Sequence, residues 1–353
     1  MTPVLLLTGL LLCCACSRKA DYIVISGYAQ GGTYTVKLNR QGPSGRVRTA
    51  PEQIKQAVDS ILYTIDTTLS GYNPSSLLSR FNAGERIPVN DMFLDIYREA
   101  RALWEETGGA LDVAAGGLFD LWGFGFTDDT LPPADRIRGL LDSVGMHTLA
   151  PGMEEVLAPG RTLSGCDLAL REGLHPVLNY NAIAQGYSCD RVADYLHGIG
   201  VKDMLVDIGE IYCDGKNPSG RSWSIGIDRP VDGNNQLGAD LDGIWQSGGK
   251  ACGIVTSGNY RKYYIRNGKK YAHTIDPRTG YPVSHTLLSA TIVAPDAMRA
   301  DAYATYCMVI GLDSARVFIQ EHPELEGYLI YDQDGEMREW ASEGFTLADG
   351  VNR

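Results

Sequence analysis

The chain has 353 residues, of which 44% are hydrophobic and 21% are charged, so it can bury a large core in one elaborate domain or in two smaller ones. Its formal net charge is -12, and its Lys and Arg residues are scattered along the sequence. A nucleic-acid-binding protein usually carries a basic patch, so the charge argues against that class of function.

The first sixteen residues differ in composition from the rest of the chain. Residues 4–12 form a nearly continuous apolar run that is too short to span a bilayer as a helix, and three crowded cysteines follow it. The small Ala15 before Cys16 resembles the lipobox of bacterial lipoproteins, in which this cysteine becomes the lipidated first residue. The alternative is an ordinary cleaved secretory signal, because no Lys or Arg precedes the run and Cys13 stands where Leu is usual.

The two readings of this segment agree that the chain is exported. We expect residues 1–16 to be a lipoprotein signal peptide and residues 17–353 to form one mature domain. A lipid on Cys16 would then anchor that domain to a bacterial membrane on its periplasmic side.

In chain order, the mature sequence alternates between β-type and helical patterns. Residues 22–38 are β-branched around Gln30-Gly31-Gly32, which predicts two strands or one strand with a glycine bulge. Apolar residues recur at helical spacing over Pro51–Leu69, and Pro51 suits the first turn of a helix. Further helices are expected at residues 92–104, 134–143, 189–197, 300–310 and 314–321. Further strands are expected at residues 204–208, 223–228, 253–257, 271–275 and 288–294, and residues 327–336 are expected to carry a last strand and an Asp334-Gly335 turn.

These patterns predict an α+β fold in which mixed and antiparallel sheets are flanked by helices. Three of the connecting segments also suit contact with a ligand. Tyr72 lies in a turn-rich stretch, where its ring could stack on a flat ligand or cap the edge of the core. Residues 110–117 are mostly small and permit close backbone approach by a helix or by a ligand. Residues 178–187 form a strand-to-helix junction, whose free N–H and carbonyl groups suit phosphate or metal contact.

Asp301 and Thr305 are candidate metal ligands. Their spacing of four places a carboxylate and a hydroxyl on one helix face, one turn apart, where two hard oxygens can share a small cation. Asp301 also suits a first-turn position in which its carboxylate accepts backbone N–H groups, and spacing alone favours this second reading. A decision between the two needs further observations.

His273 is the histidine with the most distinctive surroundings, because Asp276, Gly280 and Pro282 follow it in a turn-rich segment. A lone histidine is as often a surface or core residue as a functional one. A serine hydrolase is disfavoured, because Ser257 lacks the first glycine of a G-x-S-x-G elbow. The sequence also contains neither a Walker loop nor an H-E-x-x-H motif.

Eight short motifs occur along the mature chain. They are Ser70-x-Tyr72, Ser79-Arg80-Phe81-Asn82, Leu121-Trp122-Gly123-Phe124-Gly125, Ala182-Ile183-Ala184-Gln185-Gly186-Tyr187, Asp207-Ile208-Gly209, Thr256-Ser257-Gly258, His273-x-Ile275-Asp276-Pro277-Arg278-Thr279-Gly280 and Ala300-Asp301-Ala302-x-x-Thr305. Each motif is weak alone, but in this order they resemble the ApbE-type lipoproteins, which are FAD:protein FMN transferases. The resemblance covers the chain from Gly31 to about Leu312.

The resemblance implies roles for individual residues. Magnesium would be held by the backbone carbonyl of Ala182 and by the side chains of Asp301 and Thr305, and His273 would be the histidine of the reactive site. The residues implied to contact FAD are Gly31, Tyr72, Ala114, Ala115, Gly116, Asn179, Gln185 and Ile275.

Three positions depart from the pattern of many family members. Asn179 stands where an acid is common, Gln185 where Lys or Glu is common, and Ala304 where many members have a second Asp. With these departures, the resemblance still implies a single elaborate domain and a Mg²⁺-dependent reaction. In that reaction FMN passes from FAD to a Thr or Ser hydroxyl of a membrane flavoprotein, and AMP is released. The alternatives are a Mg²⁺-dependent FAD pyrophosphatase that gives FMN and AMP, and a non-catalytic FAD-binding lipoprotein.

Overall fold

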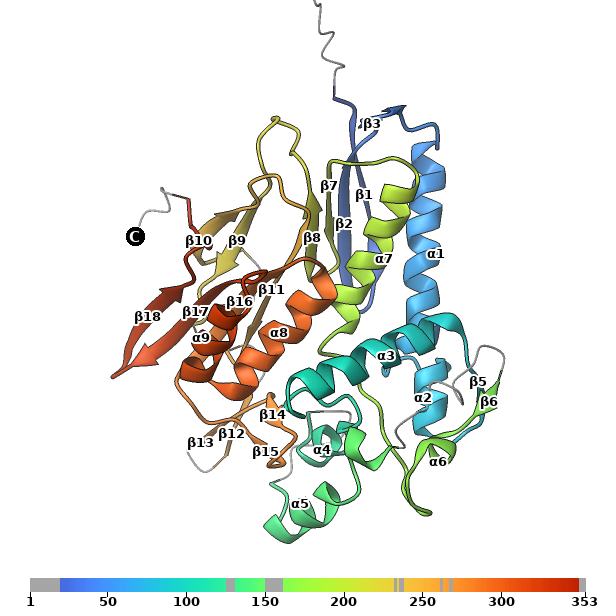
Figure 1. Ribbon diagram of the computed structural model, residues 1–353, viewed down its shortest axis with the longest axis vertical. Helices are drawn as coiled ribbons and strands as arrows, with labels where there is room; N and C mark the ends of the chain where they lie inside the picture. The colour runs from blue at the N-terminus through green and yellow to red at the C-terminus, as the bar shows by residue number, and fades with distance from the viewer. Residues whose placement is uncertain are drawn as a thin grey trace, which may run out of the picture.

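An eight-stranded sheet forms the centre of the chain, and all its neighbouring strands pair antiparallel (Figure 1). In spatial order its strands are β1 (Tyr22–Ala29), β2 (Gly32–Asn39), β7 (Met204–Asp207), β8 (Ile211–Asp214), β11 (Cys252–Gly258), β16 (Leu287–Ala294), β17 (Glu326–Gln333) and β18 (Glu336–Ala341). The predicted α+β architecture is therefore confirmed.

The structure is a computed structural model, and it describes residues 20–124, 131–149, 161–231, 234, 238–260, 263–266 and 269–348. The predicted signal peptide over residues 1–16, including Cys16, lies outside the described residues. In the part of the chain that is described, none of the helices combines the length and the apolar composition needed to cross a membrane.

Two tight hairpins join neighbouring strands of the sheet. Gln30 and Gly31 connect β1 to β2 with φ angles of 51° and 80°, and Asp334 and Gly335 connect β17 to β18 with φ angles of 57° and 85°. Two consecutive residues with positive φ make the turn whose twist matches that of antiparallel strands. Residues 22–38 are thus two strands, which is one of the two alternatives that their sequence allowed.

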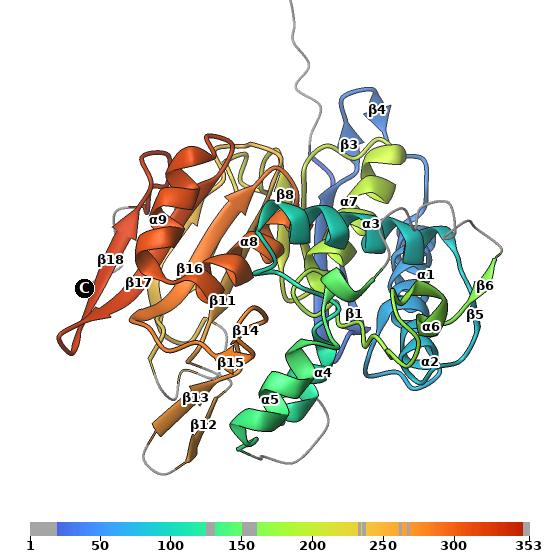
Figure 2. The same ribbon diagram turned by 60° about the horizontal axis from the view of Figure 1, so that its bottom comes forward.

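Helices cover one face of the sheet. Figure 2 shows α8 (Ala297–Ile310) and α9 (Leu312–Glu321) lying over β11, β16 and β17. The layer continues toward β1 with α7 (Ala184–Gly198) and α1 (Pro51–Leu69). The buried side chains of α1 recur every three or four positions, which is the pattern that predicted this helix. They are Ile54, Val58, Leu62, Ile65, Thr68 and Leu69.

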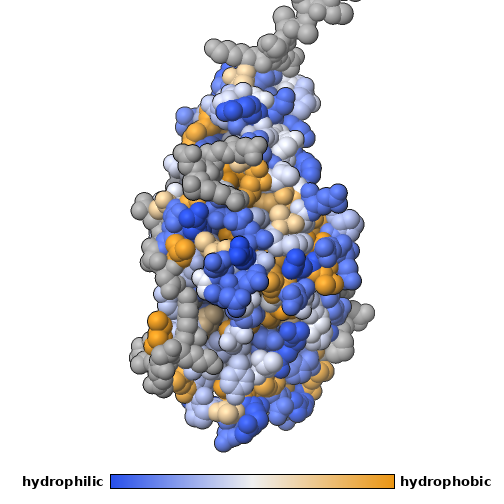
Figure 3. All heavy atoms as spheres, turned by 90° about the vertical axis from the view of Figure 1, so that its left-hand side faces the viewer, coloured by the Kyte–Doolittle hydropathy of each residue, from blue (hydrophilic) through white to orange (hydrophobic). Residues whose placement is uncertain are grey.

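The other face is covered near its centre by a two-stranded ribbon of β9 (Ser224–Asp228) and β10 (Leu241–Gln246). A separate hydrophobic cluster lies between this ribbon and the sheet and includes Trp223, Trp245 and Phe345. The edge strand β18 is mostly exposed and carries charged residues, which oppose edge-to-edge pairing with another chain. On that side of the molecule hydrophilic residues predominate, with hydrophobic ones interspersed (Figure 3).

Shorter elements form a layer beyond one end of the sheet, in the lower part of Figure 1. The helices outside the main helical layer are α2 (Leu77–Asn82), α3 (Asp91–Glu106), α4 (Gly116–Leu121), α5 (Ala134–Leu141) and α6 (Gly165–Leu168). The remaining short strands of this layer are β5 (Ile87–Pro88), β6 (Thr162–Leu163), β12 (Tyr263–Arg266), β13 (Lys269–Ala272), β14 (Ile275–Asp276) and β15 (Tyr281–Pro282). The strands β3 (Gln41–Gly42) and β4 (Gly45–Arg46) pair with each other near the top of Figure 2. A third cluster, with Trp122 and Ile275 among its members, packs α4 and α5 against this layer.

The expected strand over residues 271–275 is wrong as a continuous element. It divides into β13 and β14, and His273 and Thr274 lie between the two strands. Thr274 holds this break open, because its Oγ1 donates to Asn259 Oδ1 at 2.7 Å while its carbonyl accepts the N–H of Val283 at 3.0 Å. The interruption leaves His273 in a connecting segment instead of in a sheet.

Candidate active site

A cavity of about 830 Å³ opens where the sheet and its helices meet the lower layer. It is lined by the β1–β2 turn, the end of α1 with the loop after it, the 110–113 segment, the start of α7, the end of β11, the segment that carries His273, and α8. These segments are far apart in the sequence. The volume lies within the range of pockets that hold small molecules and cofactors.

Nine of the twelve predicted site residues line this one cavity. They are Gly31, Tyr72, Asn179, Ala182, Gln185, His273, Ile275, Asp301 and Thr305. The structure thus brings together residues that the sequence places as far apart as Gly31 and Thr305.

The other three predicted residues, Ala114, Ala115 and Gly116, are buried and lie behind the lining, which ends at Val113 in this segment. A Cβ atom at Gly116 would come within 2.6 Å of the carbonyl oxygen of Val177. The small side chains here therefore permit close approach of another backbone segment, but that segment is the extended one at Val177 and not a helix, as one of the two expected possibilities had it. Their contact with a ligand stays a prediction.

Asp301 lies on α8 with its side chain 5% exposed, and it accepts a hydrogen bond from the N–H of Gly186 at 3.1 Å. Helix α8 begins at Ala297 and is capped by its own Asp296, so Asp301 lies one turn too late to cap α8. The residue it does cap belongs to the first turn of α7. Asp301 therefore does cap a helix N-terminus, as the capping interpretation predicts, but it caps α7 instead of its own helix α8.

This hydrogen bond satisfies one of the free N–H groups at the start of α7. Gly186 is the third residue of that helix, so its N–H has no acceptor within the helix and donates to Asp301 instead, while Ala182 lies just before the helix in the cavity lining. Thr305 lies one turn further along α8, and its Oγ1 is 3.3 Å from Ser257 Oγ. A carboxylate, a hydroxyl and a backbone carbonyl, all hard oxygen donors, thus line one cavity, and this set suits Mg²⁺.

The charge of the cavity also fits a cation. Its described lining holds the carboxylates of Asp66, Asp112, Glu210 and Asp301 but no Lys or Arg. An anionic ligand such as a diphosphate would need positive charge there, and a divalent cation supplies it. No group of three or more His, Cys, Asp or Glu side chains with metal-site geometry occurs in the described ranges. A cation here would therefore depend on few protein ligands, including neutral ones.

Burial and the nearby carboxylate of Asp190 raise the pKa of Asp301 from 3.8 to about 7, although the hydrogen bond from Gly186 acts in the opposite direction. A raised pKa means that the folded, cation-free chain holds this proton more tightly than the unfolded chain does. The resulting stability is present below the ordinary pKa of an Asp and is lost as the pH rises through about 7.

We therefore expect the stabilisation by Mg²⁺ to depend on pH. Mg²⁺ competes with the proton on Asp301, so its effect on Tm should be small near pH 5.5 and should reach several degrees near pH 8. Thermal unfolding with and without Mg²⁺ measures this, and Asp301→Asn should remove most of the pH dependence. A Mg²⁺ effect in the wild type that is the same at both pH values would contradict this assignment.

His273 lies in the cavity wall beside a rigid turn. The turn pairs β14 with β15, and Asp276 holds it by accepting the backbone N–H of Arg278 and the Nε and Nη2 N–H groups of its guanidinium, each at 2.9 Å. Trp122 braces the turn from below, because its Nε1 donates to the Gly280 carbonyl at 2.8 Å. Asp276 is thus occupied in shaping the segment that carries His273 and Ile275.

Tyr72 is 64% exposed at the cavity, and its hydroxyl accepts a hydrogen bond from Asn181 Nδ2 at 3.2 Å. An exposed aromatic ring on a cavity wall is available to stack on a flat ligand ring. Gln185 is held by a bond from its Nε2 to the Ile208 carbonyl at 3.3 Å, while Asn179 Oδ1 accepts the Asn181 N–H at 2.9 Å.

Sequence reasoning missed several lining residues. Ser257 belongs to one of the eight motifs but was given no role in the site, yet it contacts Thr305. Asn181 lies within the predicted junction and contacts Tyr72, whereas Asp66 and Glu210 carry no motif signal. Asp66 could have been found from the helix pattern, since it lies in the last turn of α1, immediately before the loop of Tyr72.

The comparisons with known proteins identify the family of the chain. The model of the ApbE family matches residues 31–329. The chain belongs to the ApbE family. The FAD:protein FMN transferase of Vibrio cholerae is 32% identical over 346 residues, which cover 96% of each chain, and that of Haemophilus influenzae is 32% identical over 91% of this chain and 89% of its own length.

Solved structures of ApbE proteins share the fold. The flavin transferase ApbE from Vibrio cholerae superposes with a TM-score of 0.74 at 30% identity, covering 92% of this chain and 98% of its own. The apo form of flavinyl transferase ApbE from Pseudomonas stutzeri gives 0.76 at 28% identity, with coverage of 93% and 96%.

Proposed function

We propose that this ApbE-family chain transfers the FMN half of FAD to a Thr or Ser hydroxyl of an acceptor flavoprotein and releases AMP. The main support for the proposal is that His273, Asp301, Thr305 and Ala182 line the same cavity. Relatives named FAD:protein FMN transferase, 32% identical over most of the chain, support the same reaction.

Mg²⁺ is the cation that the donor set suits, and Asp301, Thr305 and the Ala182 carbonyl would hold it. When bound, it would neutralise charge on the pyrophosphate of FAD. The protein's own part is to keep these three oxygens fixed and close to the buried start of α7. Tyr72 offers a ring face for the flat part of the ligand at the exposed side of the cavity.

The reaction exchanges the phosphoanhydride bond of FAD for a phosphoester bond to the acceptor. The acceptor hydroxyl oxygen bonds to the FMN phosphorus, the bond between that phosphorus and the bridging oxygen breaks, and AMP leaves with the bridging oxygen. The hydroxyl proton must leave as the new bond forms, and His273 either accepts it or orients a phosphate oxygen. In both roles His273 must stay in place, which the turn held by Asp276 ensures.

Two other functions fit part of the same cavity. In an FAD pyrophosphatase water would replace the acceptor hydroxyl, so FMN would appear free in solution. A non-catalytic flavin-binding protein would not need the combination of His273 with the cation-binding oxygens. The transferase is favoured because the relatives matched over nearly the whole chain are named for transfer to protein.

The experiment that separates these functions follows both products of FAD. The purified mature chain is incubated with FAD and Mg²⁺, with and without an acceptor domain, and AMP and FMN are measured by chromatography. We expect AMP to form mainly when the acceptor is present and free FMN to stay well below AMP. Equal amounts of AMP and free FMN, unaffected by the acceptor, would assign the pyrophosphatase instead.

We also propose that the mature chain is lipid-anchored through Cys16 on the periplasmic side of the membrane. The support is the apolar run before Cys16 and the small residue that precedes it. Wild type should partition into the detergent phase, and Cys16→Ser should move to the aqueous phase. If both proteins partition alike, the chain is secreted without a lipid.

A further inference from the structure

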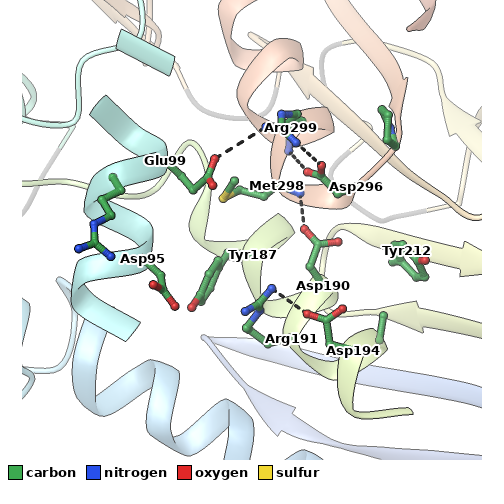
Figure 4. A pocket seen from close by; sticks show the side chains of 13 residues that line it. Asp95, Glu99, Tyr187, Asp190, Arg191, Asp194, Tyr212, Asp296, Met298 and Arg299 are labelled. Atoms are coloured by element: carbon green, nitrogen blue, oxygen red, sulfur yellow. Dashed lines mark hydrogen bonds and ion pairs between the residues drawn. The ribbon is translucent and has the colours of Figure 1, made fainter. Parts of the chain in front are cut away.

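The N-termini of α7 and α8 are capped by carboxylates from each other. Asp190 of α7 accepts the N–H groups of Ala297 and Met298, the first two residues of α8, at 2.8 and 2.9 Å. Asp301 of α8 in turn accepts the N–H of Gly186 in the first turn of α7 at 3.1 Å. Figure 4 shows the Asp190 carboxylate directed at the first turn of α8.

Helices α7 and α8 pack so closely at Gly186 and Ala297 that no additional side-chain atom fits between them. A Cβ atom at Gly186 would lie 2.2 Å from the Ala297 carbonyl oxygen, and one at Gly253 of β11 would lie 2.3 Å from the Ala297 Cα. Ala297 is therefore enclosed between α7 and β11. The Asp190 carboxylate holds it there by accepting its backbone N–H at 2.8 Å.

Ala297 shares a helix face with the candidate cation ligands. Asp301 follows it by four residues and Thr305 by eight, so all three lie along one stripe of α8. A movement of the first turn of α8 would carry the Asp301 carboxylate and the Thr305 hydroxyl with it. The position of these two oxygens in the cavity thus depends on how Ala297 is held.

We propose that Asp190 is a positioning residue for the cation site, a role that rests on the proposed binding of Mg²⁺ by Asp301 and Thr305. Asp190 does not line the cavity of that site, and it acts through the first turn of α8, whose N–H groups it accepts. Its carboxylate is also close enough to Asp301 to raise the pKa of that residue. Its side chain borders a separate cavity of about 410 Å³ between α3, α7 and α8 (Figure 4).

Capping of α8 alone does not explain Asp190. The helix has its own N-cap in Asp296, whose carboxylate accepts the Arg299 N–H at 2.7 Å. Asp190 adds a link between two helices, each of which carries part of the cation site: α8 carries Asp301, and the loop before α7 carries Ala182. A carboxylate that orients ligands in this way is expected to affect metal affinity nearly as strongly as a ligand does.

The test is a calorimetric titration of the purified chain with Mg²⁺ alone. Asp190→Asn keeps the shape of the side chain but removes its charge and one of its two acceptors, so the Mg²⁺ affinity should fall about tenfold. Asp194→Asn is the matched control, because Asp194 lies one turn further along α7 and forms an exposed pair with Arg191 at 2.7 Å. Its affinity for Mg²⁺ should equal that of the wild type.

A second control separates positioning from helix stability. Asp296→Ala removes the cap that α8 supplies for itself, so it should lower Tm while the Mg²⁺ affinity stays within about twofold of wild type. The proposal is overturned if Asp190→Asn binds Mg²⁺ as the wild type does, or if Asp296→Ala weakens binding as much as Asp190→Asn. If Asp190→Asn does not fold, Asp190→Glu tests the proposal instead. Glu keeps the negative charge, but its longer side chain moves the carboxylate away from the position that Asp190 holds. The Mg²⁺ affinity of this variant should fall at least about threefold, and no change would overturn the proposal.

Failure of the cation site itself would give a different result. If Asp301→Asn binds Mg²⁺ as tightly as the wild type, the proposed site is wrong and the role of Asp190 is wrong with it. If Asp301→Asn weakens binding and Asp190→Asn does not, only the positioning role is wrong.

Discussion

Asp301→Asn is expected to lower Mg²⁺ affinity and turnover together, each by at least about tenfold, because loss of a charged hard ligand costs at least about 1.4 kcal/mol. The substitution keeps the shape of the side chain. The amide oxygen of Asn can still accept the Gly186 N–H that Asp301 accepts at 3.1 Å. A calorimetric Mg²⁺ titration and the initial rate of AMP release at varied Mg²⁺ measure the two effects.

This choice of variant separates charge from capping. If Asp301 served only to cap α7, the Asn variant would keep full activity at low Mg²⁺. Asp296→Asn is the matched control, because it makes the same chemical change on the same helix at a position outside the cavity, and Asn is an equally good N-cap. It should leave both Mg²⁺ affinity and turnover unchanged.

His273→Ala is expected to lower the rate of transfer at saturating FAD by about 100-fold or more, the lower end of the range for a group that moves a proton in the reaction. The affinity for FAD should change by less than about threefold, because one contact among many lining residues is removed. Single-turnover transfer to an acceptor measures the rate, and quenching of flavin fluorescence measures the affinity. Equal losses in rate and in affinity would indicate that His273 serves only to bind FAD.

A second substitution at this position separates the two roles left open for His273. His273→Gln retains a hydrogen-bond donor that can orient a phosphate oxygen, but its amide cannot accept a proton. If His273 is the general base, the Gln and Ala variants should be similarly slow. Recovery of most of the rate in the Gln variant would assign the orienting role. His175→Ala, which removes an exposed histidine outside the cavity lining, is the control for loss of a ring elsewhere.

The sequence predicted elements well where local pattern determines them. The helix Pro51–Leu69 has the expected bounds, because its apolar spacing and its N-terminal proline are local signals. The expected start of α7 at residue 189 is wrong by five residues, since the helix begins at Ala184. Its first turn contains a glycine and its N-cap, Ile183, makes no side-chain cap hydrogen bond, so no start signal is visible. The cap comes from Asp301, more than a hundred residues away.

For the candidate site too, the sequence predicted what local spacing determines and missed what contacts between distant segments determine. The spacing of Asp301 and Thr305 was sufficient to place both on one helix face. It gave no indication that Gly186 donates to Asp301, the contact that holds the start of α7 against α8. His273 was expected inside a strand, because nothing local reveals that Asn259 and Val283 bond Thr274 and interrupt the sheet. Contacts between segments that are distant in the sequence determine these features, and local patterns in one sequence do not reveal such contacts.

The central claim is that the flavin is transferred to a protein, and the intact mass of the acceptor tests it most directly. After incubation with the chain, FAD and Mg²⁺, the acceptor should gain the mass of one FMN phosphoryl unit, and fragmentation should place it on a single Thr or Ser. An acceptor with that residue replaced, Thr by Val or Ser by Ala, should gain nothing. An unmodified, folded acceptor beside free FMN and AMP in solution would contradict the account and identify the chain as an FAD hydrolase.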